Sequence, residues 1–285
     1  MNELKGLGTA LITPFKADGS VDYPALARLL DTQLTGFIDY IVVLGTTGEA
    51  ATMTDVEREE VRTFIRKYVN GRLPLVLGVG GNCTAAVCES LRTIDFTGFE
   101  AVLSVCPYYN KPNQEGLYQH FCAVAEASPV PVILYNVPGR TGVNLLPETV
   151  IRIHNAHPDK ILGIKEASGN LEQIKHLITL ASNHSPFAVI SGDDGIACEV
   201  MEAGGAGLIS VASNAFPEDF WHIVHDKNAA IQAQYAEMVR LLFAEGNPVG
   251  IKAVLAQKGI IQNYLRLPLV PASKELQVRI QKELA

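Results

Sequence analysis

The sequence has 285 residues, of which 48% are hydrophobic and 19% are charged, and its formal net charge is -7. No apolar run approaches the roughly 18 uninterrupted residues that a membrane span needs, and no basic stripe offers a surface to nucleic-acid phosphates. The amino-terminal segment Met1–Gly6 lacks the basic and apolar regions of a secretory signal. We therefore expect a globular, cytoplasmic protein without membrane or nucleic-acid partners.

Cysteine and histidine residues give no sign of a metal site. The five cysteines are odd in number and lack a Cys-x-x-Cys pair, which argues against a disulfide framework and against structural zinc. All seven histidines fall in predicted helices or at helix ends, so a Ser/His/Asp hydrolase and a zinc-dependent aldolase are disfavoured. We expect the cysteines to be buried free thiols: Cys83, Cys88, Cys106, Cys122 and Cys198.

Short apolar runs alternate with amphipathic stretches along most of the chain. The runs predict strands within residues 6–15, 40–44, 74–80, 101–105, 132–135, 161–165, 187–191 and 207–211. The clearest helical patterns between them lie at residues 23–34, 55–69 and 85–94. Thr54 and Glu57 form a predicted capping box at the start of the second of these helices.

Eight strand–helix units favour a (β/α)8 barrel. Short, continuously apolar strands are typical of parallel sheets covered by helices. The alternative is an open doubly wound sheet, but its usual Gly-x-Gly-x-x-Gly turn does not occur at a strand-to-helix junction. From residue 217 onward only helical patterns appear, notably at 231–245 and 251–260. We expect a barrel over residues 1–216 that carries the active site, and a helical region over 217–285.

Lys165 ends the apolar run 161–165 and is the strongest candidate for a reactive group. Desolvation at such a position disfavours the ammonium form, lowers the pKa and makes the neutral amine available to attack a ketone. Lysine is rarely fully buried. The ordinary alternative is therefore a lysine that leaves the core for solvent and pairs with Glu166.

The ends of the other strands supply possible partners, because active sites of parallel barrels lie at the carboxyl ends of the strands. Tyr135 ends the strand before Lys165, which should place a phenol beside the amine. A phenol with a pKa of about 10 is a poor base at neutral pH. It needs hydrogen-bonded partners to relay a proton, such as Thr46 and another tyrosine.

Two further segments can hold carboxylates. In Gly45-Thr46-Thr47-Gly48-Glu49 the glycines let the backbone approach a ligand, and the hydroxyl and N–H groups can bind an anion. Arg140 lies in a Pro-Gly loop and has a planar guanidinium suited to a second carboxylate. The ordinary alternatives are a glycine turn and a surface arginine.

Two strand ends carry weaker signals. Tyr108 and Tyr109 are adjacent between prolines, and by themselves such residues are more often packing aromatics. Asp193 and Asp194 suggest a metal at first sight. We discount it, because no histidine or further acid at ligand spacing accompanies them and the Lys165 ammonium would compete with a cation.

Four motifs, in this order and spacing, resemble those of the dihydrodipicolinate synthase and N-acetylneuraminate lyase superfamily of pyruvate-dependent class I aldolases: Gly45–Glu49, Tyr108–Pro112, Tyr135–Pro138 and Ile164–Glu166. The resemblance covers nearly the whole chain. It implies a (β/α)8 barrel with a C-terminal helical region, a homotetramer built as a dimer of dimers, and no cofactor.

The same resemblance implies roles for individual residues. Lys165 forms the Schiff base with pyruvate, whose carboxylate Thr46 and Thr47 receive. Tyr135, Thr46 and Tyr109 match the proton relay of the family, in which this second tyrosine reaches into the site of a neighbouring subunit.

Further positions are implied for substrate binding. Gly192 and Ile209 match positions whose backbone carbonyls face the bound substrate. Arg140-Thr141 is the pattern of the dihydrodipicolinate synthases, which use the arginine to bind the carboxylate of the aldehyde substrate. The implied reaction condenses pyruvate with L-aspartate-4-semialdehyde to 4-hydroxy-tetrahydrodipicolinate, the first committed step toward diaminopimelate and lysine.

Two alternatives stay open at this point. One is a sister aldolase of the N-acetylneuraminate lyase or 2-keto-3-deoxygluconate aldolase type, for which Arg140 is the discriminating residue. The other is a non-catalytic barrel that binds a keto acid or serves as a structural partner. The complete set of candidate groups disfavours the latter, because a retired site has no physical need for all of them.

Weak or absent feedback inhibition by lysine is a further expectation from the resemblance. Lysine-inhibited members bind the effector at a dimer interface near Tyr108 and Asn82, which this sequence keeps. Ala50 and Ala86 stand where such members tend to have a serine and a glutamate. Without the glutamate, the effector's ammonium group loses a charge partner.

Overall fold

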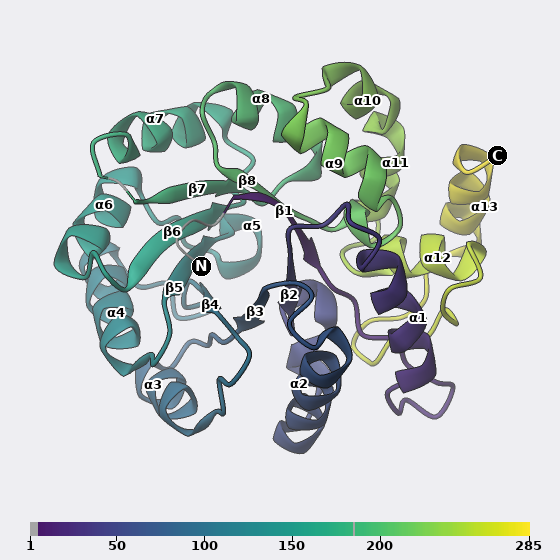
Figure 1. Cartoon of the computed structure of the whole chain (residues 1–285), viewed down its shortest axis with the longest axis horizontal. Helices are drawn as coiled ribbons and strands as arrows, with labels where there is room; N and C mark the ends of the chain where they lie inside the picture. Colours follow the sequence, from purple (N-terminus) through teal and green to yellow (C-terminus); the bar gives the residue numbers. More distant parts are fainter. Residues whose placement is uncertain (1–4, 185) are drawn as a thin grey trace. The chain divides into compact units, whose positions relative to one another are not determined.

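Eight parallel strands form a closed barrel in the order in which they occur in the chain (Figure 1). The computed structural model describes residues 5–184 and 186–285, so the first four residues of the segment predicted to lack a secretory signal lie outside the described residues. The predicted (β/α)8 architecture is confirmed. The strands are β1 Gly6–Ala10, β2 Tyr40–Val43, β3 Leu75–Gly78, β4 Ala101–Val105, β5 Val132–Asn136, β6 Ile161–Glu166, β7 Ala188–Ser191 and β8 Gly207–Ser210.

Contacts divide the chain into two compact units. We call them the Lys165 unit, which contains Pro74–Ile209 with residues 5–6, and the Thr46 unit, which contains Leu7–Leu73 and Ser210–Ala285. The predicted boundary between a barrel over residues 1–216 and a helical region over 217–285 stays a prediction. Among the described residues, no helix combines the length and the apolar character required to cross a membrane.

In the Lys165 unit, the helices longer than a single turn pack in sequence order outside the strands (Figure 1). Strand β5 is buried along its whole length, as expected for a strand whose outer face is covered by helices. The helices are α3 Thr84–Thr93, α4 Gln114–Ala127, α5 Pro138–Thr141, α6 Pro147–Ala156, α7 Leu171–Ala181 and α8 Ala197–Glu202, with a 3-10 turn η3 at Asp194–Ile196.

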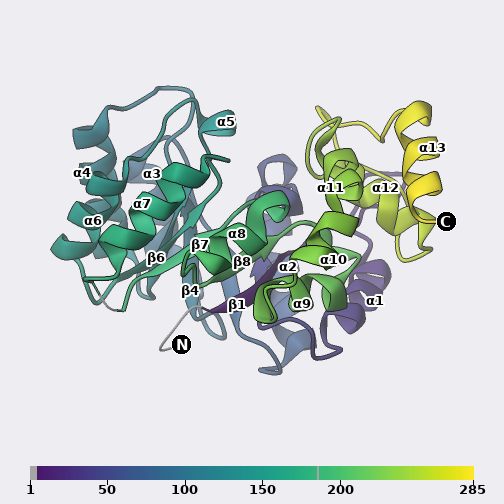
Figure 2. The same ribbon diagram turned by 90° about the horizontal axis from the view of Figure 1, so that it is seen from above.

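In the Thr46 unit, α11, α12 and α13 pack against one another (Figure 2). The capping box predicted for α2 is confirmed, because the Thr54 amide donates to Glu57 Oε2 at 2.9 Å and the Glu57 amide donates to Thr54 Oγ1 at 3.2 Å. The helices are α1 Tyr23–Gln33, α2 Asp55–Val69, α9 Pro217–His225, α10 Ala229–Gln234, α11 Ala236–Phe243, α12 Val249–Gln257 and α13 Lys274–Glu283, with 3-10 turns η1 Thr46–Gly48, η2 Ala50–Thr52 and η4 Ala212–Asn214.

Three local predictions are wrong. The helix expected at 231–245 breaks at Tyr235, because the Tyr235 hydroxyl donates to Asp219 on α9 at 2.6 Å and its ring packs against two aromatic rings of the same region. Arg140 lies on the single turn α5 rather than in an irregular loop. Cys83 is exposed at the start of α3, and Cys122 is half-buried, whereas the other three cysteines are buried.

Candidate active site

Lys165 and Tyr135 lie side by side on neighbouring strands. The two residues are paired in the register of β5 and β6, so their side chains share one face of the sheet. Lys165 Nζ lies 4.6 Å from the centroid of the Tyr135 ring. Both residues are buried, at 6% and 7% exposure. The expected proximity of phenol and amine is therefore present in the structure.

Glu166 faces away from this pair, because successive side chains of a strand point to opposite faces. Its Oε2 accepts a hydrogen bond from Asn136 Nδ2 at 2.9 Å, and its Oε1 accepts one from the Ser168 amide at 2.8 Å. Burial raises the pKa of the Glu166 carboxyl, although the hydrogen bonds oppose this effect. The alternative of a Lys165–Glu166 surface pair is thus wrong.

A hydrogen-bond network extends from Glu166 to the segment that carries Arg140. Asn136 Oδ1 accepts from the Leu145 amide at 2.9 Å, and Asn136 Nδ2 donates to Asn144 Oδ1 at 2.7 Å. Asn144 Nδ2 in turn donates to Gln173 Oε1 at 2.7 Å. The network therefore links Asn136, directly before the segment 137–145, to the residues at the end of that segment. Sequence reasoning missed it; the polar Asn136 at the end of an apolar run was the available signal.

Gly192 leaves room for the Lys165 side chain. A Cβ atom added at Gly192 would lie 2.9 Å from Lys165 Cε and 2.6 Å from Ala167 Cβ, which is closer than real contacts allow. The Gly192 amide donates to the Glu166 carbonyl at 2.8 Å and so continues the strand pairing. Ile209 is buried in β8, at 1% exposure.

Tyr109 and Arg140 are both exposed and belong to the Lys165 unit, in which Arg140 lies on α5. The Tyr109 side chain is 89% exposed. Its amide donates to the carbonyl of Thr141, the residue after Arg140, at 3.3 Å. The Arg140 amide donates to the Val137 carbonyl at 2.9 Å within α5. The contact between Tyr109 and Thr141 brings together the two segments that carry the predicted tyrosine and arginine.

Thr46 and Thr47 belong to the Thr46 unit and form the turn η1, which begins three residues after the last residue of β2. Leu44, two residues before the turn, and Glu49, directly after it, lie in the left-handed region of backbone space, with φ 57° and 54°. Thr46 is exposed, whereas Thr47 is buried at 3% exposure. Thr13 Oγ1 donates to the carbonyl of Gly48, the last residue of the turn, at 2.8 Å.

Asn247 contacts the turn from the segment before α12. Its Nδ2 donates to Thr47 Oγ1 at 2.9 Å, and the Asn247 side chain is itself 7% exposed. Sequence reasoning did not select Asn247, because nothing in its neighbourhood indicates a contact with a residue 200 positions away.

A buried ion pair joins the end of the turn to α12. Glu49 and Lys252 are paired, and both side chains are fully inaccessible to solvent. Lys252 Nζ also donates to the Tyr264 carbonyl at 3.0 Å and lies 4.2 Å from the centroid of the Phe15 ring. Burial lowers the pKa of Lys252 to about 8, although the charge of Glu49 opposes this effect.

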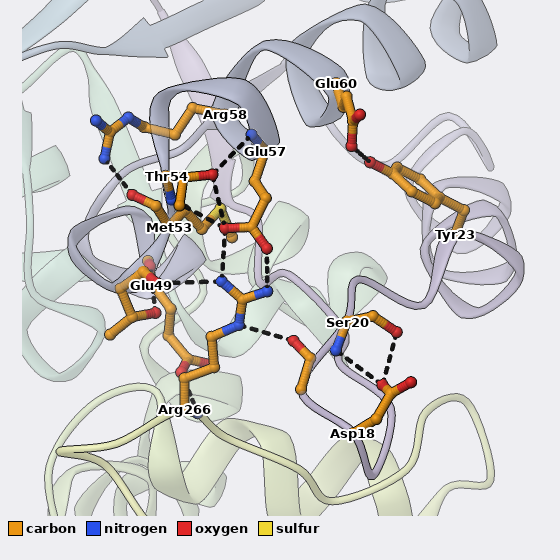
Figure 3. Close-up of polar contacts among 12 residues, drawn as sticks. Asp18, Ser20, Tyr23, Glu49, Met53, Thr54, Glu57, Arg58, Glu60 and Arg266 are labelled. Carbon is orange, nitrogen blue, oxygen red and sulfur yellow. Dashed lines mark hydrogen bonds and ion pairs between the residues drawn. The ribbon is translucent and has the colours of Figure 1, made fainter.

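Arg266 links the same turn to α2 (Figure 3). Its amide donates to Glu49 Oε2 at 3.2 Å, and its guanidinium Nη1 donates to Glu57 Oε2 at 2.9 Å and to the Thr52 carbonyl at 3.0 Å. The hydrogen bond from Arg266 is the main reason why the pKa of Glu57 falls to about 2. Sequence analysis found Glu57 as a helix cap but not as a partner of Arg266.

Asp193, the first residue of the acidic pair after β7, caps the local turn. Asp193 Oδ1 accepts from the Gly195 amide at 2.8 Å and caps η3. Within residues 5–184 and 186–285, no group of three or more His, Cys, Asp and Glu side chains is placed to hold a metal ion.

Comparison with known proteins fixes the family. The model of the dihydrodipicolinate synthetase family matches residues 3–285. The chain belongs to this family. A curated member, the 4-hydroxy-tetrahydrodipicolinate synthase of Parabacteroides distasonis, is 50% identical over 275 residues, which are 94% of this chain and 92% of that protein. The family assignment confirms the resemblance predicted from the four motifs.

Solved structures from the dihydrodipicolinate synthetase family have the same fold. A monomeric dihydrodipicolinate synthase variant superposes with a TM-score of 0.93 at 40% identity, covering 98% of this chain and 96% of that one. The chloride-inhibited dihydrodipicolinate synthase of Acinetobacter baumannii, solved in complex with pyruvate, gives a TM-score of 0.93 at 38% identity over 98% of this chain and 97% of that one.

Proposed function

We propose that the chain is a lyase of the class I aldolase type, which condenses pyruvate with L-aspartate-4-semialdehyde to 4-hydroxy-tetrahydrodipicolinate on the route to diaminopimelate and lysine. The observation that carries this proposal is the buried pairing of Lys165 with Tyr135, with Nζ 4.6 Å from the ring centroid, in a chain of this family. The curated relative with 50% identity bears the name of the enzyme for this reaction.

Lys165 supplies the nucleophile. Its neutral amine attacks the ketone carbon of pyruvate, and the resulting carbinolamine loses water to give a Schiff base. Loss of a proton from the pyruvate methyl group then gives an enamine, whose carbon attacks the aldehyde carbon of the second substrate, and the aldehyde oxygen takes up a proton. The amino group of that substrate then attacks the imine carbon, which closes the ring and releases the Lys165 amine. Tyr135 is within reach of the amine and is proposed to pass these protons on, together with Thr46 and Tyr109.

The remaining site residues hold and orient the substrates. Thr46 and Thr47 are proposed to bind the pyruvate carboxylate through hydroxyl and backbone N–H groups, as turns with converging N–H groups bind anions. The Arg140 guanidinium is proposed to bind the carboxylate of the semialdehyde in a bidentate manner. The backbone carbonyls of Gly192 and Ile209 are proposed to face the bound substrate.

The assembly and the setting of the enzyme are part of the proposal. We propose a cytoplasmic homotetramer, built as a dimer of dimers, in which Tyr109 reaches the site of a neighbouring subunit; its 89% exposure in the isolated chain fits such a role. The weak or absent lysine feedback inferred from Ala50 and Ala86 stays a prediction, and a submillimolar inhibition constant would contradict it.

A turnover assay with three substrate sets tests the function. Purified protein is mixed with pyruvate and aspartate-4-semialdehyde, and separately with N-acetylneuraminate and with 2-keto-3-deoxygluconate. We expect pyruvate consumption with the semialdehyde and no cleavage of either sugar acid. Cleavage of a sugar acid alone would assign the chain to the sister aldolases and would mean that Arg140 does not select the second substrate.

A further inference from the structure

The Thr46–Thr47 turn is bracketed by two residues in an unfavourable backbone conformation. Leu44 and Glu49 both have the left-handed φ values that residues with a side chain rarely adopt. Such conformations persist where the surrounding structure fixes them, and they are concentrated at functional sites. The contacts that fix this turn are therefore candidates for a role in substrate binding.

Among these contacts, the one from Asn247 is made directly to the Thr47 hydroxyl, which is proposed to bind the pyruvate carboxylate. Its amide Nδ2 lies 2.9 Å from Thr47 Oγ1, and both side chains are more than nine-tenths buried. A hydroxyl group has one hydrogen to donate and two positions at which it accepts. Because Asn247 donates to Thr47, the Thr47 oxygen acts as the acceptor in this pair. The hydrogen of Thr47 is then left to donate to another group.

The same stretch of chain fixes the end of the turn independently. Lys252, five residues after Asn247, forms the fully buried ion pair with Glu49. Arg266 adds a backbone hydrogen bond to the other carboxylate oxygen of Glu49 (Figure 3). These contacts hold the backbone of the turn when Asn247 is changed, so the effect of Asn247 on the Thr47 hydroxyl can be measured separately.

We propose that Asn247 is a positioning residue for the pyruvate carboxylate: by donating a hydrogen bond to Thr47 Oγ1, it sets the Thr47 hydroxyl as a donor to that carboxylate. This inference rests on the proposed function. Asn247 does not contact the substrate. It acts through Thr47, by fixing the direction and the donor role of one hydroxyl group.

The test measures the pyruvate concentration that gives half-maximal borohydride trapping on Lys165. Trapping needs pyruvate alone, so it reports on the first substrate without the aldehyde. For Asn247→Ala we expect this concentration to rise about tenfold, which corresponds to the lower end of the range for a hydrogen bond to a charged group. For Asn247→Asp we expect a larger rise, because a carboxylate accepts the Thr47 hydrogen and repels the substrate. At saturating pyruvate, the extent of trapping should equal that of the wild type.

Asn228→Asp is the matched control, because it makes the same chemical change elsewhere in the Thr46 unit. Asn228 Oδ1 accepts from the Ile231 amide at the start of α10, and aspartate caps helices equally well. We expect its half-saturation to stay within about twofold of the wild type. Thermal unfolding of each variant shows that it is folded, and the nearly isosteric Asn247→Asp decides the question if Asn247→Ala does not fold.

A double-substitution cycle separates positioning from a general structural effect. In a Thr47→Val background the hydroxyl is absent, so adding Asn247→Ala should change half-saturation by less than about twofold. A full additional tenfold rise in that background would overturn the inference, and so would an unchanged half-saturation in Asn247→Ala alone. Failure of wild-type protein to trap pyruvate on Lys165 would instead overturn the proposed function.

Discussion

The two units position their candidate site residues by different means. In the Lys165 unit, the backbone hydrogen bonds between β5 and β6 set Tyr135 opposite Lys165. A buried hydrogen-bond network around Glu166 holds Asn136 at the end of β5. In the Thr46 unit, Thr46 and Thr47 lie on a turn, whose backbone is not held by strand-to-strand hydrogen bonds. Side chains from distant parts of the chain hold that turn, and one of these contacts, between Lys252 and Glu49, is an ion pair.

This difference explains where the candidate site residues of each unit are vulnerable. The positions of residues on strands are fixed by main-chain hydrogen bonds, which a single side-chain substitution does not remove. The turn depends on individual buried side chains, and removing one partner of a buried charge pair leaves the other charge without compensation. We therefore expect the largest losses of stability from substitutions in the anchors of the Thr46 turn.

The largest effect is expected for Lys252→Met. This change leaves the Glu49 carboxylate buried without its partner, so we expect a loss of about 3–5 kcal/mol in the free energy of unfolding. Urea-induced unfolding at neutral pH measures it. Lys274→Met, at an exposed position at the start of α13, is the control and should change the free energy by less than about 0.5 kcal/mol.

Removing both charges sharpens this prediction. The double variant Glu49→Gln with Lys252→Met has no uncompensated buried charge, so it should be more stable than Lys252→Met alone. A loss below about 1 kcal/mol for the single variant would show that the pair is unimportant and would remove the contrast between the two units.

A smaller effect is expected for Glu166→Gln in the Lys165 unit. The carboxylate accepts from Asn136 and Ser168, and a glutamine must place an N–H group toward one of these donors. We expect a loss of about 1–3 kcal/mol in the free energy of unfolding.

The pH dependence of this variant provides a second check. Burial raises the folded-state pKa of Glu166, so the native state binds this proton more tightly than the unfolded state does. Over the interval between the two pKa values, this residue therefore makes the wild type less stable as the pH rises. Glu166→Gln should lack that contribution, and an unchanged pH profile would contradict the assignment.

The smallest effect is expected for Glu57→Gln. Arg266 holds the folded-state pKa of Glu57 at about 2, below its ordinary value of 4.5. The contribution of the Glu57 carboxylate to the stability of the folded state is therefore fully present above pH 4.5 and is lost as the pH falls toward 2. We expect roughly 1 kcal/mol at neutral pH, because solvent screens this partly exposed pair.

Unfolding experiments from pH 7 down to pH 2 test this expectation. The difference between wild type and Glu57→Gln should shrink over the acidic part of the range. Glu60→Gln is the control on the same helix, where the carboxylate accepts from the Tyr23 hydroxyl at 3.3 Å at an exposed position (Figure 3). A difference that does not change with pH would mean that Glu57 acts only as a helix cap.

The features that sequence analysis predicted are those with local causes. Strand β4 and helix α2 begin and end at the predicted residues, Ala101–Val105 and Asp55–Val69, because apolar periodicity and a capping box mark their limits. The neighbourhood of Lys165 and Tyr135 followed from strand order. The break at Tyr235 did not, because a tyrosine within an amphipathic pattern gives no hint of its hydrogen bond to Asp219.

The anchors of the Thr46 turn were beyond sequence analysis for the same reason. The bond from Asn247 to Thr47 joins residues 200 positions apart, and that from Arg266 to Glu57 joins residues 209 apart. Only the folded chain brings such residues together. Lys252 is similarly ordinary in the sequence, where a lysine in a helix is expected to reach solvent.

The central claim is that Lys165 forms the covalent bond to pyruvate, and peptide mapping after borohydride reduction tests it most directly. Wild-type protein treated with pyruvate should carry one stable adduct, on the peptide that contains Lys165. Lys165→Met should carry none, whereas Lys160→Met, at the residue directly before the same strand, should trap pyruvate like the wild type. An adduct on another lysine, or none with wild-type protein, would contradict the account.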